Sequence, residues 1–315
     1  MKELKVCFVG IGSIAKRHIK NLNKLCNEKH IKLVIDAVRR GGKAGTEECF
    51  IYINQIYSSV NELTSMYDVV FITNPTEYHM ETLKRTENVG KNFFIEKPIV
   101  SLKQINEMLK YNKKRDAIYY VACPLRYNAV IQYIKENILL KDVLSIRSIS
   151  SSYLPDWRPG QDYRDTYSAH TQLGGGVSID LIHEWDYLTY LFGMPQNVSY
   201  MNGKKSNLEI DSDDYAIYIA EYPDKIVELH LDYFGRKTIR QIELITKDDT
   251  IVGDIANNTI TFLKKGKTID FCEERDDYQL RELRHFIDMV DSKSNSDSDI
   301  DHALGVLKLT QGELG

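Results

Sequence analysis

Short apolar runs alternate with polar, helix-capable segments over the first third of the chain. The apolar runs fall at 5–9, 32–38, 68–73, 92–95 and 118–122. Strands separated by helical segments are typical of βαβ units, which form a parallel sheet covered on both faces. We therefore expect residues 1–123 to form one α/β domain around a parallel sheet.

The pattern changes after Pro124. Residues 129–140 have the periodicity of one amphipathic helix, and apolar and polar positions then alternate along 143–151, 214–222, 226–233, 240–246 and 259–264. A period of two predicts a largely antiparallel sheet with one buried face and one free face. Helical patterns follow at 278–290 and 300–311. We expect residues 124–315 to form a second α/β domain with an open sheet.

A glycine-rich turn follows the first apolar run. It reads Gly10-Ile11-Gly12-Ser13-Ile14-Ala15 and precedes a predicted helix at 16–25. In G-x-G-x-x-A turns the first glycine permits the tight turn, the second lets the backbone approach a pyrophosphate, and the small third residue lets helix and strand pack. The helix N-terminus favours an anion. The pattern predicts dinucleotide binding by Gly10, Gly12, Ser13 and Ile14, with a purely structural turn as the alternative.

The end of the second predicted strand bears on the choice of nicotinamide cofactor. An acidic residue there binds the adenosine 2′-hydroxyl, whereas an arginine accommodates a 2′-phosphate. Asp36 lies inside the strand, while Arg39 and Arg40 stand at its tip with Lys43 close behind. We expect NADP to be preferred over NAD. Alternatively, both arginines are solvated, or stack on adenine without discriminating.

The apolar run at 92–95 ends in Glu96-Lys97-Pro98. Ligands of open α/β sheets bind at the carboxyl ends of strands, so we expect Glu96 and Lys97 at the cofactor site. A desolvated lysine can exchange a proton with a hydroxyl or carbonyl while a hydride moves. The alternative is a surface ion pair between Glu96 and Lys97.

A glycine run at 174–176 opens a predicted helix that carries Asp180, His183 and Asp186. Steps of three place these side chains on one face. A carboxylate one turn from an imidazole can set its tautomer and raise its basicity. No further ligand cluster is evident nearby, so no metal is expected. The alternative is a polar helix face with a satisfied histidine.

The irregular segment 157–167 is dense in arginine and aromatic residues. Trp157, Arg158, Tyr163 and Arg164 are of the types that stack on sugar rings and clamp carboxylates or phosphates. The alternative is a loop packed against its own domain or a subunit partner.

Composition narrows the class of protein. The 315 residues are 43% hydrophobic and 27% charged with a net charge of −4, so we expect a folded protein without nucleic-acid or membrane partners. No apolar stretch has the length of a membrane span, and the run after Met1 lacks a signal-peptide pattern. Five scattered cysteines without C-x-x-C spacing predict reduced thiols in a cytoplasm. Because the chain stops just after a helical pattern, a natural C-terminus beyond Gly315 stays open.

Taken in order, these segments resemble the Gfo/Idh/MocA oxidoreductases, the glucose–fructose oxidoreductase and inositol dehydrogenase group, over nearly the whole chain. The motifs that carry the resemblance are 10–15 with His18, Thr73-Asn74-Pro75 with His79, Glu96-Lys97-Pro98, Leu125-Arg126-Tyr127, and 174–176 with Asp180 and His183. The resemblance implies a Rossmann domain and a C-terminal α/β domain whose open sheet forms a dimer interface. It also implies that the 73–75 loop and His79 lie beside the nicotinamide ribose and that Lys97 is catalytic.

One departure concerns the predicted catalytic helix. Many members of the family have a step of four from aspartate to histidine, whereas Asp180 and His183 are three apart and Glu184 follows. A sub-group shares this Asp-x-x-His-Glu form, so we keep His183 as an active-site candidate.

We therefore expect an NAD(P)-dependent oxidoreductase that transfers a hydride between nicotinamide and a hydroxyl or keto carbon of a sugar or sugar derivative. Lys97 would handle the proton, with His183 and Asp180 assisting. The residues expected to hold the substrate, a nucleotide sugar or a carboxylated sugar, are Arg126, Trp157, Arg158, Tyr163, Arg164 and His183. Two alternatives stay open: a tightly bound cofactor serving redox-neutral epimerisation, elimination or glycoside cleavage, and a non-catalytic NADP-binding sensor. A homodimer or homotetramer through the C-terminal sheet is expected.

Overall fold

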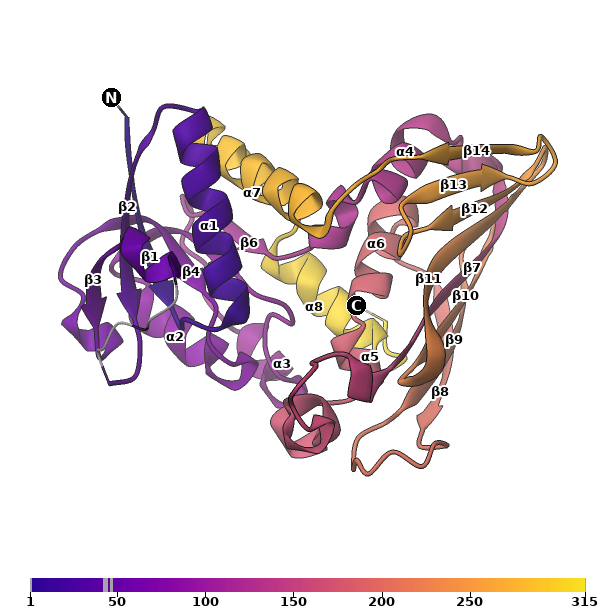
Figure 1. The fold of residues 1–315 in the computed structure, drawn as a ribbon, viewed down its shortest axis with the longest axis horizontal. Coiled ribbons are helices and arrows are strands. Elements are labelled where there is room, and N and C mark those ends of the chain that lie inside the picture. Colours follow the sequence, from indigo (N-terminus) through magenta and orange to yellow (C-terminus); the bar gives the residue numbers. More distant parts are fainter. Residues whose placement is uncertain (1, 42–44, 46–47, 315) are drawn as a thin grey trace. The chain divides into compact units, whose positions relative to one another are not determined.

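The fold is that of a computed structural model, which describes residues 2–41, 45 and 48–314. Two compact units make up the chain, and Figure 1 traces it through both. The first unit contains Met1–Ala122 and Arg275–Ala303, and the second contains Cys123–Glu274 and Leu304–Gly315.

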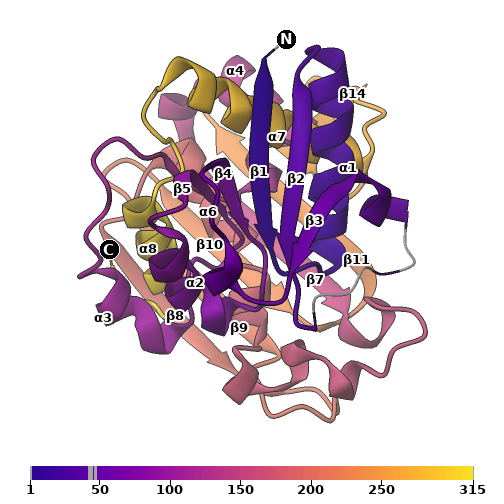
Figure 2. The same ribbon diagram turned by 90° about the vertical axis from the view of Figure 1, so that its left-hand side faces the viewer.

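The first unit is built on a six-stranded parallel sheet in the order β3-β2-β1-β4-β5-β6 (Figure 2). Its strands are β1 (Glu3–Val9), β2 (Lys32–Val38), β3 (Ile53–Tyr57), β4 (Tyr67–Ile72), β5 (Gly90–Ile95) and β6 (Tyr119–Val121). The five predicted apolar runs are thus confirmed as strands. β3 was not predicted, because it is the edge strand and none of its residues is fully buried. The strand order is that of a dinucleotide-binding sheet.

The helices of the first unit are α1 (Ser13–Glu28), α2 (His79–Thr86), α3 (Ile105–Met108) and α7 (Arg275–Ser292). α1 and α7 lie side by side, as Figures 1 and 2 both show. The apolar stripe of α1, formed by Ile19, Leu22 and Leu25, is completely buried. The amphipathic pattern therefore fixes which face of the helix meets the sheet.

The position of α7 differs from the expected domain boundaries, which assigned all of 124–315 to the second domain. Phe286 of α7 lies 5.2 Å from the ring of Phe94, 5.4 Å from that of Tyr120 and 6.2 Å from that of Phe71. Burying an aromatic ring among other rings is strongly favourable, so α7 packs with the first unit despite its distance in sequence. The first unit is consequently discontinuous.

The second unit contains an eight-stranded sheet in the order β14-β13-β12-β11-β7-β10-β9-β8. Its strands are β7 (Val143–Tyr153), β8 (Asn197–Gly203), β9 (Tyr215–Glu221), β10 (Ile226–Asp232), β11 (Phe234–Thr246), β12 (Thr250–Asp254), β13 (Thr259–Phe262) and β14 (Lys267–Asp270). Only the β7–β10 pair among these is parallel, which confirms the largely antiparallel sheet. The pattern missed β8, β12 and β14.

The helices α4 (Ala129–Asn137), α5 (Val177–Asp180) and α6 (His183–Phe192) lie on one side of this sheet, whereas Figure 1 shows no helix on its other side among the described residues. The helix α8 (Ile300–Leu309) contains the boundary between the two units. The short 3-10 helices are Glu48–Tyr52, Val60–Glu62, Thr76–Tyr78, Leu102–Gln104, Pro124–Tyr127, Leu140–Asp142, Leu154–Asp156, Tyr163–Asp165, Tyr167–Ala169 and Thr171–Leu173.

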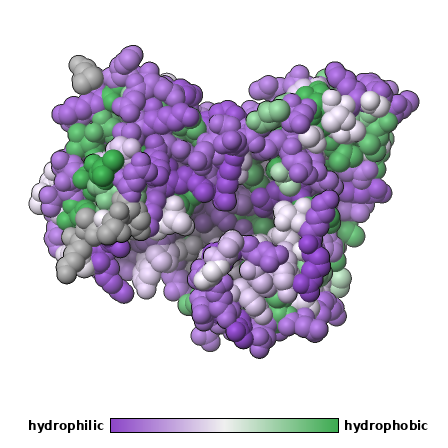
Figure 3. Space-filling model, viewed as in Figure 1, coloured by the Kyte–Doolittle hydropathy of each residue, from purple (hydrophilic) through white to green (hydrophobic). Residues whose placement is uncertain are grey.

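The uncovered face of the second sheet carries aliphatic side chains. Met201, Ile219 and Ile226 project from β8, β9 and β10 and are 57%, 50% and 42% exposed. The view in Figure 3 is mostly hydrophilic, with hydrophobic residues along the right-hand edge, where Figure 1 places β7 and β11. This face is therefore suited to further packing, as the alternating pattern predicted.

Candidate functional site

The glycine turn after β1 has the geometry that dinucleotide binding requires. Gly10 has φ +92°, and a Cβ there would lie 2.6 Å from the Cα of Asn74, so no larger residue fits. A Cβ on Gly12 would meet no atom within 4 Å. Ala15 is completely buried against the sheet. The first N–H groups of a helix have no partner within it, so open space at Gly12 before α1 suits an anion.

Ser13 and Ile14 are the first two residues of α1, with Ser13 exposed and Ile14 half-buried. The first turn of the helix contains no acidic residue that would repel a phosphate. Both residues therefore lie where the sequence motif predicts cofactor contacts.

The loop after β4 is bound tightly to the glycine turn. The Thr73 hydroxyl donates to the carbonyl oxygen of Gly10 at 2.7 Å, and the Asn74 amide donates to Thr82 at 2.7 Å. Among the described residues the Asn74 Oδ1 is buried without a hydrogen-bond partner. An unpaired buried acceptor costs about 1–3 kcal/mol, so a ligand hydroxyl that donates to it would relieve this cost. This observation fits a bound nucleotide ribose. Pro75 precedes the 3-10 helix Thr76–Tyr78 as its N-cap.

His79 was expected beside the cofactor, but the structure buries its side chain. Its Nε2 lies 2.8 Å from the carbonyl oxygen of Asn74, and its Nδ1 lies 3.1 Å from the carbonyl oxygens of Pro98 and Ile99. Burial lowers the pKa of His79. We interpret His79 as a residue that joins the loops after β4 and β5 and so positions Asn74 and the segment around Lys97.

Glu96 forms an interior pair with a helix residue. Its Oε1 lies 2.6 Å from Nε2 of His18 on α1, and its side chain is 13% exposed. Burial by itself raises the pKa of Glu96, but the hydrogen bond and charge of His18, with Lys97 and His79, hold it below its usual range. The alternative of a surface Glu96–Lys97 ion pair does not fit this burial. Half-buried Lys97 lies two residues after the carboxyl end of β5, where it was expected.

The end of β2 carries the residues expected to read the adenosine ribose. Asp36 is buried and accepts a hydrogen bond from the Tyr67 hydroxyl at 2.9 Å, so it faces the interior. The Arg39 guanidinium lies over the ring of Phe50 at 5.2 Å, and Arg40 is exposed. Lys43 lies outside the described residues. The two arginines thus stand at the strand tip, and Asp36 does not compete with them for the adenosine ribose.

The glycine run in the second unit brings two segments against the start of α5. A Cβ on Gly175 would lie 2.1 Å from the carbonyl oxygen of Tyr167, and one on Gly176 would lie 2.1 Å from Oδ1 of Asp213. Gly176 also has φ +130°. Asp213 accepts a hydrogen bond from the Ser178 N–H at 3.2 Å. The glycines are therefore needed for close backbone approach.

The single helix predicted after the glycine run was wrong. α5 ends at Asp180 and α6 begins at His183, because the N–H of Ile182 bonds to Ile179 in a tight three-residue turn. Asp180 accepts a hydrogen bond from the Tyr233 hydroxyl at 2.5 Å. Asp186 accepts hydrogen bonds from Arg126. Because the helix is broken between Asp180 and His183, Asp186 shares no continuous helix face with Asp180. His183 is half-buried at the first position of α6.

Arg126 was expected to hold substrate, but its side chain is 2% exposed. Its Nε and Nη2 donate to the two carboxylate oxygens of Asp186 at 2.9 and 2.6 Å, and its guanidinium lies 5.2 Å from the ring of Tyr190. We therefore interpret Arg126 as a residue that holds Pro124–Tyr127 against α6.

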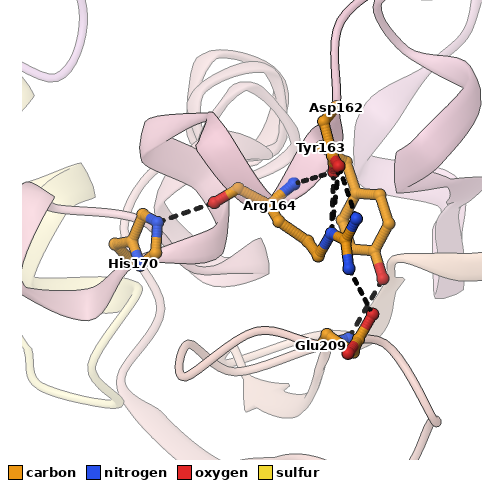
Figure 4. Close-up of polar contacts among 5 residues, drawn as sticks. All are labelled: Asp162, Tyr163, Arg164, His170 and Glu209. Atoms are coloured by element: carbon orange, nitrogen blue, oxygen red, sulfur yellow. Dashed lines mark hydrogen bonds and ion pairs between the residues drawn. The ribbon is translucent and has the colours of Figure 1, made fainter.

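Part of the segment 157–167 is bound to its own unit, as Figure 4 shows. Arg164 makes a two-pronged pair with Asp162 and also bonds to Glu209 at 2.9 Å. The pair lowers the pKa of Asp162 to about 2. The Tyr163 hydroxyl oxygen accepts the N–H of Glu209 at 3.1 Å, and His170 Nε2 lies 2.7 Å from the carbonyl oxygen of Arg164. For Arg164 the alternative of a loop packed on its own domain therefore holds.

The other part of the segment lies beside Asp180. The Trp157 ring meets the ring of Tyr233 edge-on at 5.2 Å, and its Nε1 donates to Ser152 at 2.9 Å. The Arg158 guanidinium lies 5.2 Å from the ring centroid of Tyr167. Trp157, Arg158, Gln161, Tyr163 and Thr166 line a small hollow.

Tyr167 and Tyr233 are residues that sequence reasoning did not single out. The Tyr233 hydroxyl donates a hydrogen bond to Asp180, and the Tyr167 hydroxyl lies beside the same carboxylate. Burial together with that carboxylate raises the pKa of both hydroxyls, so both remain protonated. The chain contains 20 tyrosines, and nothing in their spacing marks these two.

Glu184 is buried beside Arg240. The Arg240 Nε lies 2.7 Å from the Glu184 Oε1, and burial raises the pKa of Glu184.

The described residues contain no group of three or more His, Cys, Asp or Glu side chains that could hold a metal ion. Within the same residues, the helices are all too short or too polar to span a membrane.

Comparisons with known proteins place this geometry in a family. The family model "Oxidoreductase family, NAD-binding Rossmann fold" matches residues 4–123, and "Oxidoreductase family, C-terminal alpha/beta domain" matches residues 135–312. An uncharacterized oxidoreductase, YrbE of Bacillus subtilis (strain 168), is 25% identical over 205 residues, which are 64% of this chain and 58% of the relative. An uncharacterized oxidoreductase of Streptococcus pneumoniae is also 25% identical, over 54% of this chain and 48% of its own length. The chain thus spans about half the length of the curated relatives it matches.

Solved structures share the fold over the whole chain. The UDP-N-acetylglucosamine 3-dehydrogenase GnnA from Acidithiobacillus ferrooxidans has a TM-score of 0.78 at 18% identity, covering 99% of this chain and 96% of that one. A levoglucosan dehydrogenase in complex with NADH and levoglucosan has a TM-score of 0.83 at 15% identity, with the same coverage. On the two family matches, this chain belongs to the Gfo/Idh/MocA oxidoreductase family, with its NAD-binding Rossmann fold and C-terminal α/β domain.

Proposed function

We propose that this protein is an NAD(P)-dependent oxidoreductase that acts on a hydroxyl or keto carbon of a sugar or sugar derivative. The observation that carries the proposal is the position of Lys97, which is half-buried two residues after the end of β5, in a sheet whose glycine turn leaves the N-terminus of α1 open. The family match supports the cofactor class. Two proteins of the same fold are named as dehydrogenases of UDP-N-acetylglucosamine and of levoglucosan, which supports the substrate class.

The nucleotide would be held by the glycine turn, the N-terminus of α1 and the Asn74 Oδ1. A nicotinamide bound there would supply the hydride acceptor for oxidation or the hydride donor for reduction. Lys97 takes the hydroxyl proton as the carbonyl forms, and returns it in the reverse direction. Glu96 is held as a carboxylate by His18 and supplies negative charge next to Lys97.

We assign the assisting roles to groups of the second unit. The Tyr233 hydroxyl donates a hydrogen bond to the Asp180 carboxylate, the Tyr167 hydroxyl lies beside it, and His183 begins the next helix. We assign Asp180 and His183 to substrate hydroxyl binding and proton transfer. Trp157, Arg158 and Tyr163 remain in the proposed substrate set, whereas we leave out Arg126 and Arg164 because each is paired with a carboxylate.

We further propose NADP as the preferred cofactor, because Arg39 and Arg40 stand at the tip of β2 while Asp36 faces the interior. Titration of the purified protein with NADPH and NADH, followed by nicotinamide fluorescence, tests both cofactor proposals. Tight NADPH binding and weak NADH binding supports the arginine assignment. A preference for NADH makes both arginines bystanders, and cofactor already present in the purified protein favours the redox-neutral alternative.

The uncovered face of the second sheet supports a homo-oligomer. Its exposed aliphatic side chains alternate with charges of both signs, such as Arg147 between Glu228 and Glu243, and such a surface can complement a second copy of itself. None of the five cysteines forms a disulfide, and we propose that their thiols stay reduced.

A further inference from the structure

The arginines of the second unit differ in whether a carboxylate already neutralises them. Arg126 is paired with Asp186, and Arg164 with Asp162 and Glu209. The Arg158 guanidinium instead lies over the face of the Tyr167 ring. Within the part of the chain that the structure describes, Arg158 forms no ion pair. A half-buried guanidinium held against a ring retains its forked donors for an anion.

Tyr167 connects Arg158 to the proposed catalytic carboxylate. Its ring faces Arg158, its hydroxyl lies beside the Asp180 carboxylate, and its backbone carbonyl abuts Gly175 so closely that no Cβ fits between them. These three contacts set the position of Tyr167 while its side chain stays partly open to solvent, at 44% exposure. Arg158 and Asp180 are therefore held apart by one phenol ring.

We propose that Arg158 and Tyr167 form an anion-recognition element, so that the substrate is a sugar carrying a carboxylate or phosphate group across one ring from the hydroxyl that Asp180 binds. This inference rests on the proposed function and narrows its substrate class. A six-membered sugar ring has a width similar to that of a phenol ring. A sugar whose hydroxyl contacts Asp180 can thus present an anionic substituent to Arg158. The hollow beside Arg158 adds the Gln161 amide and the Trp157 ring, groups that bind anions and sugars.

Matched pairs of sugars test the charge requirement. The protein, saturated with the nicotinamide nucleotide it prefers, is titrated calorimetrically with glucose and glucuronate, galactose and galacturonate, and N-acetylglucosamine and its UDP derivative. We expect the anionic member of a pair to bind about tenfold or more tightly than its neutral twin, the difference that one charge-assisted hydrogen bond makes. The uronate and UDP arms show whether the anion is a carboxylate or a diphosphate.

Three variants assign the preference to its residues. Arg158→Gln should abolish the anionic preference, because it weakens binding of the anionic member far more than binding of the neutral twin. Arg236→Gln is the matched control, because Arg236 also lies over a tyrosine ring, that of Tyr153 at 3.9 Å, and should keep the preference. Tyr167→Phe retains the ring under Arg158 but removes the hydroxyl. It should keep the preference and KM while kcat falls, since Tyr167 acts through Asp180 as a positioning residue.

The outcomes separate this inference from the proposed function. Absence of an anionic preference, its survival in Arg158→Gln, its equal loss in Arg236→Gln, or failure of every sugar to bind overturns the recognition element. Oxidation of neutral sugars at the rate of anionic ones overturns it too but leaves the oxidoreductase proposal standing. Conversely, an Arg158-dependent preference without any hydride transfer supports the recognition element and contradicts the proposed function.

Discussion

The buried Arg126–Asp186 pair provides a sharp test of the reassignment of Arg126. Asp186→Asn would leave a guanidinium that is 2% exposed facing a neutral amide in place of a carboxylate. Breaking a buried ion pair by changing one partner costs about 3–5 kcal/mol, because the remaining charge is uncompensated. For a unit of this size roughly 2–4 °C are lost per kcal/mol, so the thermal transition of the second unit should fall by about 10 °C.

The matched control is Asp162→Asn, which removes the carboxylate from a similar two-pronged arginine pair. There the arginine side chain is 51% exposed, and solvent screens the charges. We expect no measurable shift in the transition. Thermal and urea unfolding of the three proteins, followed by circular dichroism, measure the difference. A third variant, Arg126→Met with Asp186→Leu, should recover most of the loss, because a packed apolar pair needs no compensating charge.

Equal shifts in Asp186→Asn and Asp162→Asn would refute the assignment. So would an Arg126→Met variant that keeps its stability and loses only substrate affinity, because that result would return Arg126 to the substrate site as first expected.

Three further predictions concern other parts of the molecule. Gly10→Ala should lower the thermal midpoint, because its methyl group meets the Asn74 backbone, whereas Gly12→Ala should keep the midpoint and weaken nucleotide binding; thermal scans and NADPH titrations distinguish the two. Burial lowers the pKa of His79 in the folded protein. The imidazole therefore takes up a proton more readily in the unfolded chain than in the folded one, and stability should fall as the pH drops below about 6.5. His79→Asn should flatten that slope in urea midpoints, and an unchanged slope would contradict the cause. Ile219→Asp, on the uncovered sheet face, should dissociate any oligomer in gel filtration with light scattering; an unchanged mass would exclude this face.

Local patterns were sufficient for the parts of the fold whose residues are neighbours in sequence. The strand β1, the glycine turn and α1 were predictable together, since apolar runs, glycines and helical periodicity each act within a few residues. The position of Lys97 was predictable for the same reason, because it lies two residues after a buried strand.

Features that depend on distant contacts were not predictable. Phe286 joins the first unit through rings that lie far away in sequence, and half-exposed β3 has no apolar run. The interior partners of Asp180 and Arg126 decide which charges stay available, and only the folded chain brings Tyr167, Tyr233 and Asp186 to them. Sequence reasoning therefore gave the chemical groups of the proposed site, but it could not show that Arg126 and Arg164 are paired with carboxylates.

The most direct test of the central claim compares turnover and nucleotide binding in Lys97→Ala. The control is Lys91→Ala, a lysine of β5 that forms a surface pair with Asp68. With the sugar panel and the preferred nucleotide, Lys97→Ala should lose about 10²–10⁴-fold in turnover, the usual contribution of a general acid or base, while its nucleotide affinity and the activity of Lys91→Ala stay unchanged. Turnover in Lys97→Ala equal to that of the natural chain would contradict the mechanism.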